Sequence, residues 1–179
     1  GIHELTTIKL SDRKVQEFHI QSYPYFASLL LYNHYPIPYP IQISSPTLVG
    51  GELERRGFIV AVPMSNVENF DILAIHKKTY KQFAIQVKTT SYKSKKWTLT
   101  AKNENLIGDN IIYVFVALNR LEAPSFHIVP SAIVAKEVKE SHQNWLKAPR
   151  RDGGSHRDNN LRNFKDDNDI YLNRWDFFD

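Results

Sequence analysis

Alternating apolar and polar positions predict a set of short strands through the middle of the chain. The alternation is clearest from Tyr80 to Thr89, where one face of an extended strand would carry Phe83, Ile85 and Val87. Comparable apolar runs, bounded by turn residues, predict strands at about 57–63, 69–76, 80–89, 96–101, 110–118 and 125–129. The pattern therefore predicts a multistranded sheet.

Two further segments have the spacing of helices. The first covers about 46–56, with Ser45 as the N-cap, Pro46 in the first turn and the pair Gly50-Gly51 weakening its interior. The second covers about 132–147 and follows Ser131 as its cap. Its apolar residues are spaced to form one buried stripe: Ile133, Val134, Val138, Trp145 and Leu146.

The distribution of these elements divides the chain into three parts. Residues 1–43 form an N-terminal arm of unclear structure, in which Pro36, Pro38 and Pro40 interrupt any regular element. Residues 44–148 form the core domain, and residues 149–179 form a C-terminal loop and tail. A length of 179 residues with 42% hydrophobic and 23% charged residues fits one globular domain with appended segments.

Composition also excludes several classes of protein. The chain has no cysteine, so it can form neither a disulfide nor a cysteine-based zinc site, and this agrees with a cytoplasmic protein. Its longest apolar runs are too short to cross a bilayer, so no membrane partner is expected. The seven histidines show no metal-binding pair on one helix, and His127, in an apolar strand, is expected to be a packed, hydrogen-bonded residue.

The polar face of the strand at 80–89 carries the candidate chemistry. Gln86 and Lys88 lie opposite its apolar face, and Asp71 lies near the start of the preceding strand, across a short hairpin loop. A solvent-facing strand would account for the same pattern, but Ala84 shares this face and Asp71 is placed to meet the other two. Mg²⁺ prefers oxygen ligands and keeps several waters, so a carboxylate, an amide and a backbone carbonyl can hold it.

Three segments in this order resemble the core of the PD-(D/E)xK nuclease superfamily: Gly57–Pro63, Phe70–Leu73 and Ile85–Thr90. Glutamine in the place of the second acid is similar to the branch related to group I intron homing endonucleases and to uncharacterised bacterial relatives. Phe126–Pro130 and Tyr171-Leu172-x-x-Trp175-Asp176 also look like those relatives. The resemblance covers about residues 46–130. It implies a restriction-endonuclease-like α/β core, with a central mixed sheet of about five strands flanked by helices.

The same resemblance implies an activity and a site. The expected function is metal-dependent DNA endonuclease, with Asp71, Gln86 and Lys88 as catalytic residues. Asp71, Gln86 and the Val87 carbonyl would hold Mg²⁺ or Mn²⁺, and Lys88 would position the attacking water or stabilise the transition state. DNA is the expected partner, and the homodimers found among related nucleases are compatible with this chain.

One position departs from the family pattern. Family members carry a glutamate about eleven residues before the glycine that ends the first helix, and here that place is Pro46. Glu52 is a tentative replacement, although it lies about 240° further around the helix. The departure supports a second reading, in which the chain is a catalytically degenerate nuclease-fold module that binds DNA or a protein partner. A third reading, an assembly role, rests on the aromatic residues of the N-terminal arm.

Positive charge is concentrated around the candidate site. The formal net charge is only +4, but between positions 71 and 102 eight lysines face the single acid Asp71. Lys93, Lys95, Lys96 and Trp97 form a basic loop ending in an aromatic residue, which is typical of a nucleic-acid-binding surface. Trp97 would either stack on a base or turn into the core. A second basic set consists of four arginines and is equally compatible with phosphate contacts and with a solvated loop: Arg150, Arg151, Arg157 and Arg162.

Overall fold

The computed structural model describes residues 44–63, 69–91, 95–119 and 122–179. Residues Gln42–Asp179 form one compact unit, and the arm expected at 1–43 lies outside the described residues. The described elements are, in chain order, α2 (Ser45–Arg55), β1 (Phe58–Ala61), β2 (Ile72–His76), β3 (Gln82–Thr90), β4 (Lys96–Thr100), the 3₁₀ helix η1 (Ala101–Glu104), β5 (Ile111–Ala117), β6 (Ser125–Pro130), α3 (Ser131–Lys147), β7 (Leu161–Lys165) and the 3₁₀ helix η2 (Trp175–Phe178).

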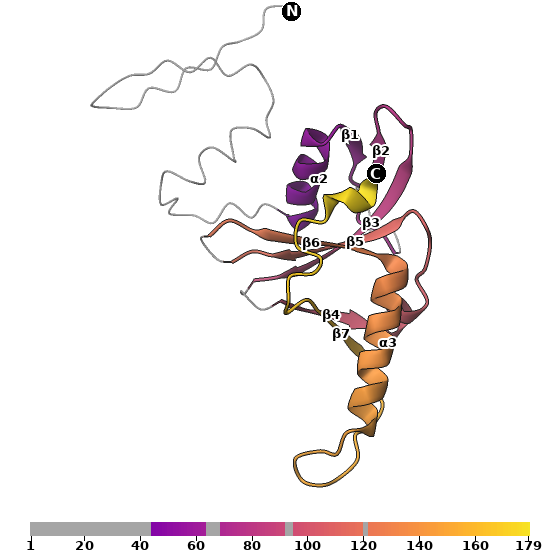
Figure 1. Cartoon of the computed structure of the whole chain (residues 1–179), viewed down its shortest axis with the longest axis vertical. Helices are drawn as coiled ribbons and strands as arrows, with labels where there is room; N and C mark the ends of the chain where they lie inside the picture. The colour runs from indigo at the N-terminus through magenta and orange to yellow at the C-terminus, as the bar shows by residue number, and fades with distance from the viewer. Residues whose placement is uncertain (1–43, 64–68, 92–94, 120–121) are drawn as a thin grey trace, which may run out of the picture. The chain divides into compact units, whose positions relative to one another are not determined.

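Five strands form a mixed sheet in the order β1-β2-β3-β5-β6 (Figure 1). The β3–β5 pair is parallel, and the other three pairs are antiparallel. The parallel step is possible because β4, η1 and the following loop separate β3 from β5 and give the chain room to return. This architecture, with a helix on each face, is a restriction-endonuclease-like α/β fold, and the expected fold class is confirmed.

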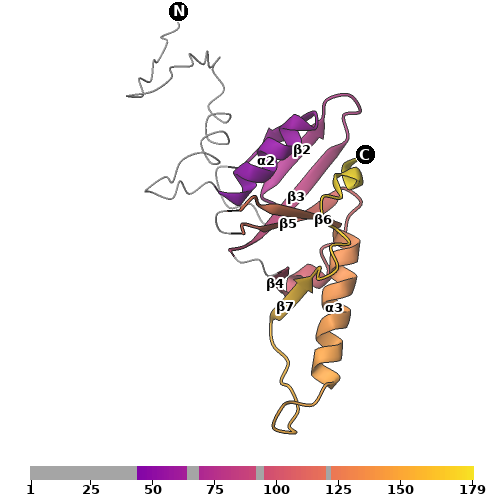
Figure 2. The same ribbon diagram turned by 60° about the vertical axis from the view of Figure 1, so that its left-hand side comes forward.

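The two faces of the sheet bury separate apolar clusters. The α2 face packs Val49 and Leu53 of α2 against Phe83, Ile85 and other residues of β1, β2, β3, β5 and β6. The opposite face packs α3 and a small second sheet, β4–β7, against Tyr113, Phe115 and Val129. Figures 1 and 2 show α2 and α3 on opposite sides of the five-stranded sheet. Strand β5 is buried on both faces, which explains its unbroken apolar sequence.

The glycine pair in α2 has a structural reason. Gly50 is buried against β1, and a Cβ atom built on it would lie 3.3 Å from Cγ1 of Val60. A side chain there would push the helix away from the sheet, whereas Gly51 faces open space. The helix begins one residue earlier than expected, with Ser44 as its N-cap and Pro46 in the first turn. The sequence pattern therefore located α2 correctly but missed the close approach at Gly50.

The C-terminal segment is part of the core unit rather than a tail beside it. Residues 161–165, assigned from the sequence to the C-terminal loop and tail, form β7, which pairs antiparallel with β4. The chain then crosses the outer edge of β6 through a bridge between His127 and Leu172. It ends in η2, where Phe178 packs edge-to-face on Phe58 and Phe83. This crossing covers an edge strand that would otherwise present unpaired backbone groups.

Near the C-terminal end of α3, the buried residues differ from those expected from the sequence. Val134 and Val138 are buried as expected, but Trp145 is 38% exposed, stacks on His142 and packs on His156 in a tilted arrangement. Ser131 does not act as a side-chain cap, because its hydroxyl exchanges hydrogen bonds with the backbone N–H and carbonyl of Gly108. None of the helices in the described ranges is long and apolar enough to cross a membrane.

Packing of α2 on the sheet predicts that alanine substitutions at two leucines lower the stability of the protein by different amounts. Leu53→Ala should lower the free energy of unfolding by about 2–5 kcal/mol, because Leu53 is fully buried and its loss leaves a cavity. Leu161→Ala, at a position that is 57% exposed in β7, is the matched control and should change it by less than about 0.5 kcal/mol. Urea denaturation measures both values, and equal losses would contradict the packing described.

Candidate functional site

The register of β2 and β3 brings Asp71 opposite Gln86. Ile72 pairs with Ile85 and Leu73 with Ala84, so the next position outward places Asp71 across from Gln86. Directly opposed residues project to the same face of a sheet. The backbone N–H of Asp71 also donates to the Ile85 carbonyl at 2.8 Å. Antiparallel pairing thus brings together two residues that are fifteen positions apart.

The Asp71 carboxylate is held by two donors from β3. Its Oδ2 accepts a short hydrogen bond from Nε2 of Gln86 and a 2.7 Å hydrogen bond from the backbone N–H of Val87. Gln86 is only 8% exposed and Asp71 is partly buried. Strand β2 begins at Ile72, so the Asp71 carboxylate accepts the Val87 N–H hydrogen bond just beyond the last backbone pair of β2 and β3. The three residues therefore form one ordered polar group.

Val87 meets Asp71 through its N–H. In an extended strand, the N–H and carbonyl of one residue leave the backbone on the same side, so the Val87 carbonyl also points toward the β2 side. The Val87 side chain faces the other way, into the cluster beneath α2. Its backbone is consequently placed beside the carboxylate while its side chain anchors the strand.

Lys88 lies on the same face as Gln86, two residues further along β3. Its register partner in β5 is Phe115, and its side chain is partly buried. No hydrogen bond or ion pair of Lys88 is found within the described ranges. On this face Ile59 and Leu73 are 56% and 42% exposed, so no described residue covers the β1–β2 half of the sheet here. The polar group thus lies at the border between the covered and uncovered halves.

The donor set at Asp71 fits a hard divalent cation. A carboxylate oxygen, an amide oxygen and a backbone carbonyl are the ligand types that Mg²⁺ takes alongside its waters. Gln86 now presents its amide NH₂ to Asp71, and rotation of the amide by 180° would present Oε1 instead. The same atoms can therefore either hydrogen-bond directly or share a cation.

A buried tyrosine borders this group on β5. Tyr113 is the register partner of Gln86, and its hydroxyl accepts a 2.8 Å hydrogen bond from Nδ2 of Asn103. Burial raises the pKa of the Tyr113 hydroxyl above its ordinary value, although the Asn103 bond acts in the other direction. The phenol therefore stays neutral near physiological pH and adds no negative charge beside Asp71.

Glu52 is engaged elsewhere. Its carboxylate forms a short ion pair with Arg56 one turn later, and the Arg56 guanidinium lies 4.1 Å from the ring centre of Trp175. Helix α2 covers the face of the sheet opposite to the one that carries Gln86 and Lys88. Pro46 supplies no carboxylate. The described residues thus do not bring a second acid from α2 into contact with Asp71.

The expectation that Trp97 is available for base stacking is wrong. The indole is 1% exposed, and its Nε1 donates to the Val116 carbonyl at 3.0 Å. It packs on Phe115 and Phe164, so the alternative, a residue that turns into the core, is correct. The cause is strand alternation: in β4 the odd positions face the sheet and the even positions face solvent.

The basic residues around Trp97 fall into separate environments. Lys96 is exposed, whereas Nζ of Lys95 lies 2.5 Å from Oδ2 of Asp169. Lys93 lies outside the described residues. Among the arginines expected to form a second patch, Arg162 is buried in an ion pair with Glu104, and Arg150 pairs with Asp152 at 3.0 Å. The sequence therefore overstated how many of these cations are available to a ligand.

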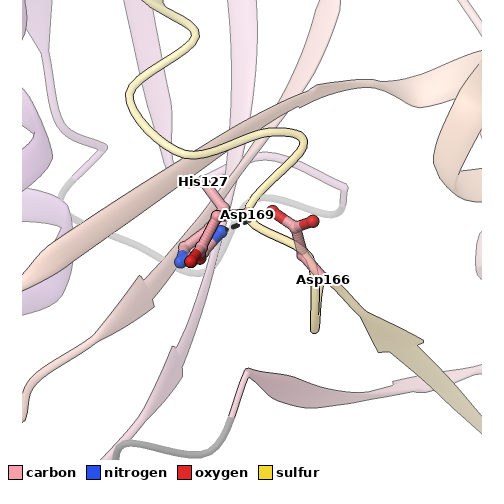
Figure 3. A group of neighbouring side chains, drawn as sticks. All are labelled: His127, Asp166 and Asp169. Atoms are coloured by element: carbon pink, nitrogen blue, oxygen red, sulfur yellow. Dashed lines mark hydrogen bonds and ion pairs between the residues drawn. The ribbon is translucent and has the colours of Figure 1, made fainter.

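A second polar cluster was missed because β7 was not predicted. His127 is fully buried, as expected for a packed residue, and its Nδ1 lies 2.6 Å from Oδ2 of Asp166. One potential ligand atom from each of His127, Asp166 and Asp169 lies within 4.8 Å of the others (Figure 3). The only sequence signal is the pair of aspartates spaced by three, which has no meaning until β7 places it beside β6.

Comparisons with known proteins find similar solved structures but no sequence match. No protein-family model and no curated protein sequence matches the chain. A bacterial homing endonuclease, I-Ssp6803I, aligns over 73% of this chain and 82% of its own, with 13% identity and a TM-score of 0.40. The Holliday junction resolvase Hjc from Archaeoglobus fulgidus aligns over 69% and 88%, with 14% identity and a TM-score of 0.35. Both are nucleases, and scores this low carry no argument about the activity of this chain.

The hydrogen bonds accepted by the Asp71 carboxylate predict that its removal lowers the free energy of unfolding. Asp71→Ala should lower the free energy of unfolding in metal-free buffer by about 1–3 kcal/mol, because the Gln86 amide and the Val87 N–H lose their acceptor. Asp109→Ala, at an exposed loop position, is the control and should change it by less than about 0.5 kcal/mol. A loss at Asp71 no larger than at Asp109 would show that the carboxylate does not order this end of β3.

Proposed function

We propose that the chain is a metal-dependent DNA endonuclease whose site is built on Asp71, Gln86, the Val87 carbonyl and Lys88. The observation that carries this proposal is the carboxylate of Asp71 held against Gln86 and Val87 where β2 begins, with Lys88 on the same face of the sheet. An ordered acid, an amide and a lysine beside an uncovered sheet face are the elements needed to bind and hydrolyse a phosphodiester.

Each residue has a distinct part in this proposal. Asp71, Gln86 and the Val87 carbonyl would hold Mg²⁺ or Mn²⁺, which when bound supplies Lewis-acid polarisation of the scissile phosphate. Lys88 would carry the positive charge that offsets negative charge developing on the phosphate oxygens, or would orient the attacking water. The Val87 and Ile85 side chains fix the strand in the core, so the polar groups stay in place when substrate binds.

The second candidate is a nuclease-fold module that binds DNA without cutting it. Two observations favour it: Pro46 stands at the family's glutamate position, and Glu52 is paired with Arg56. A site with one carboxylate holds a divalent cation less tightly than a site with two, because each acid contributes charge and a ligand. Cleavage by the unmutated chain separates the two candidates.

The proposal predicts that substitution of Asp71 or Lys88 abolishes or slows DNA cleavage but leaves DNA binding intact. Asp71→Asn keeps an oxygen acceptor for Val87 but removes the charge, so Mg²⁺-dependent cleavage of plasmid DNA should fall below detection. Lys88→Ala should slow cleavage by about two orders of magnitude or more, because charge stabilisation of this kind contributes a few kcal/mol. DNA binding in Ca²⁺ or EDTA, measured by gel shift, should stay within about threefold of the unmutated chain.

The outcomes of this experiment are distinguishable. Unmutated chain that binds duplex, single-stranded and branched DNA but cuts none of them with Mg²⁺ or Mn²⁺ would establish the degenerate module. Cleavage that survives Asp71→Asn would place the active site elsewhere. Lys136→Ala, an exposed change on α3, is the control for handling and nuclease contamination.

If the basic loop of Lys93, Lys95 and Lys96 contacts DNA, its neutralisation should change how DNA binding depends on salt concentration. Replacing Lys93, Lys95 and Lys96 together by Gln should weaken binding to unrelated DNA sequences by a similar factor, because phosphate contacts carry no base information. The slope of log K against log salt should fall by up to about 3, roughly 0.9 for each phosphate that the variant no longer neutralises.

A control with the same change in net charge is available on α3. Lys136, Lys139 and Lys147 are all exposed, and their replacement by Gln removes three charges from α3 instead of from the basic loop. The control triple variant should keep most of the salt slope. Equal effects of the two triple variants would mean that net charge, and not the loop, attracts DNA.

A further inference from the structure

One buried nitrogen in the second polar cluster has no hydrogen-bond partner. The imidazole of His127 is completely buried between β4 and the turn that follows β7, with the Trp97 ring centre 5.1 Å away. Its Nδ1 is bonded to Asp166, but Nε2, also buried, has no partner in the described residues. An unsatisfied buried polar atom costs about 1–3 kcal/mol, so a native structure retains one where something else compensates for it.

Asp166 fixes the orientation of this imidazole. Its Oδ2 accepts from the His127 ring and from the backbone N–H of Tyr171 at 3.0 Å, and its Oδ1 accepts from the backbone N–H of Ile170 at 2.8 Å. Two backbone N–H groups already donate to this carboxylate, so the hydrogen-bond network assigns Nδ1 of His127 as a third donor to it. In the neutral ring the lone pair is then on Nε2, which is the form that binds metals.

Asp169 supplies a second ligand at the same place. Its carboxylate belongs to the group in which one ligand atom of each member lies within 4.8 Å of the others, and Figure 3 shows it beside the imidazole. Two ligands of one zinc ion lie about 3–4 Å apart, and the ligand atoms of this group lie within 4.8 Å of one another, which is close to that spacing. His127 and Asp169 thus offer one nitrogen and one oxygen to a shared ion.

The surface is hollowed beside Asp169. Asp169 is 39% exposed at its side chain and lines a hollow together with Lys95, Ser125 and Leu172. An ion arriving through this hollow would meet the Asp169 carboxylate first and would keep water in its remaining positions. Lys95 now pairs with this carboxylate, so its ammonium would compete with a bound cation.

We propose that His127 Nε2 and the Asp169 carboxylate form a zinc-class transition-metal site, with Asp166 as the positioning residue for the imidazole. Imidazole nitrogen with carboxylate oxygen suits Zn²⁺ or Co²⁺, whereas an all-oxygen set such as that at Asp71 suits Mg²⁺. The site would tie the C-terminal crossing to β6 beside the bridge between His127 and Leu172. It is independent of the nuclease activity proposed above.

The test is metal binding by the full chain, measured by equilibrium dialysis with Zn²⁺ and by the visible absorption of bound Co²⁺. Asp169→Asn should weaken Zn²⁺ binding at least about tenfold, because it removes a charged ligand. Lys95→Gln breaks the same ion pair but keeps the ligand, so it should bind Zn²⁺ as tightly as the unmutated chain or more tightly. Asp167→Asn, an exposed neighbour in the same turn, is the control and should have no effect.

A second measurement separates this site from the one at Asp71. The melting temperature of the unmutated chain and of Asp71→Asn should rise on addition of Zn²⁺, and that of Asp169→Asn should not. The proposal is overturned if the unmutated chain binds no Zn²⁺ at micromolar concentration, or if Asp169→Asn binds it unchanged. It is also overturned if Lys95→Gln weakens binding as much as Asp169→Asn does, since the ion pair alone would then explain the loss.

Discussion

The pairing of β3 with β2 on one side and β5 on the other is the constraint on which the rest of the structure depends. The antiparallel pair places Asp71 opposite Gln86, and the parallel pair buries β3 beside the most apolar strand of the sheet. Just before β2 begins, the Asp71 carboxylate accepts a hydrogen bond from the Val87 N–H, which a longer β2 would have paired through its backbone. A hydrogen bond that completes the sheet is therefore the same one that orders the candidate site.

The two polar clusters lie on one face of the sheet and are separated by aromatic packing. Lys88 pairs in register with Phe115, and Phe115 pairs with His127. Phe115 stacks on Phe164 with ring centres 4.4 Å apart, so an apolar wall stands between the two groups. These rings keep the two polar groups from contacting one another directly. Each cluster can therefore hold its own ligand.

The C-terminal segment connects the two layers that the sheet separates. Strand β7 and Phe164 belong to the α3 face, whereas Phe178 of η2 belongs to the α2 face. Between them the chain crosses β6, where the Ile128 N–H donates to the Tyr171 carbonyl at 2.9 Å. The Asp166 carboxylate organises the turn before this crossing through the backbone N–H groups of Ile170 and Tyr171. The buried pair of His127 and Asp166 thus anchors the chain where it changes face.

The sequence by itself determined the strands other than β7, both helices, the fold class and the face on which Gln86 and Lys88 lie. The strands, helices and faces follow from local periodicity, which depends only on neighbours along the chain, whereas the fold class follows from the resemblance of three short segments to a known superfamily. Tertiary structure alone decided that Trp97 is buried, that Arg162 is paired with Glu104, and that Asp166 meets His127. These three outcomes depend on β7 pairing with β4 across more than sixty residues, and the polar sequence Leu161–Lys165 gives no periodic signal of that contact. A residue's neighbours in space are set by the register of distant strands, which single-sequence patterns do not encode.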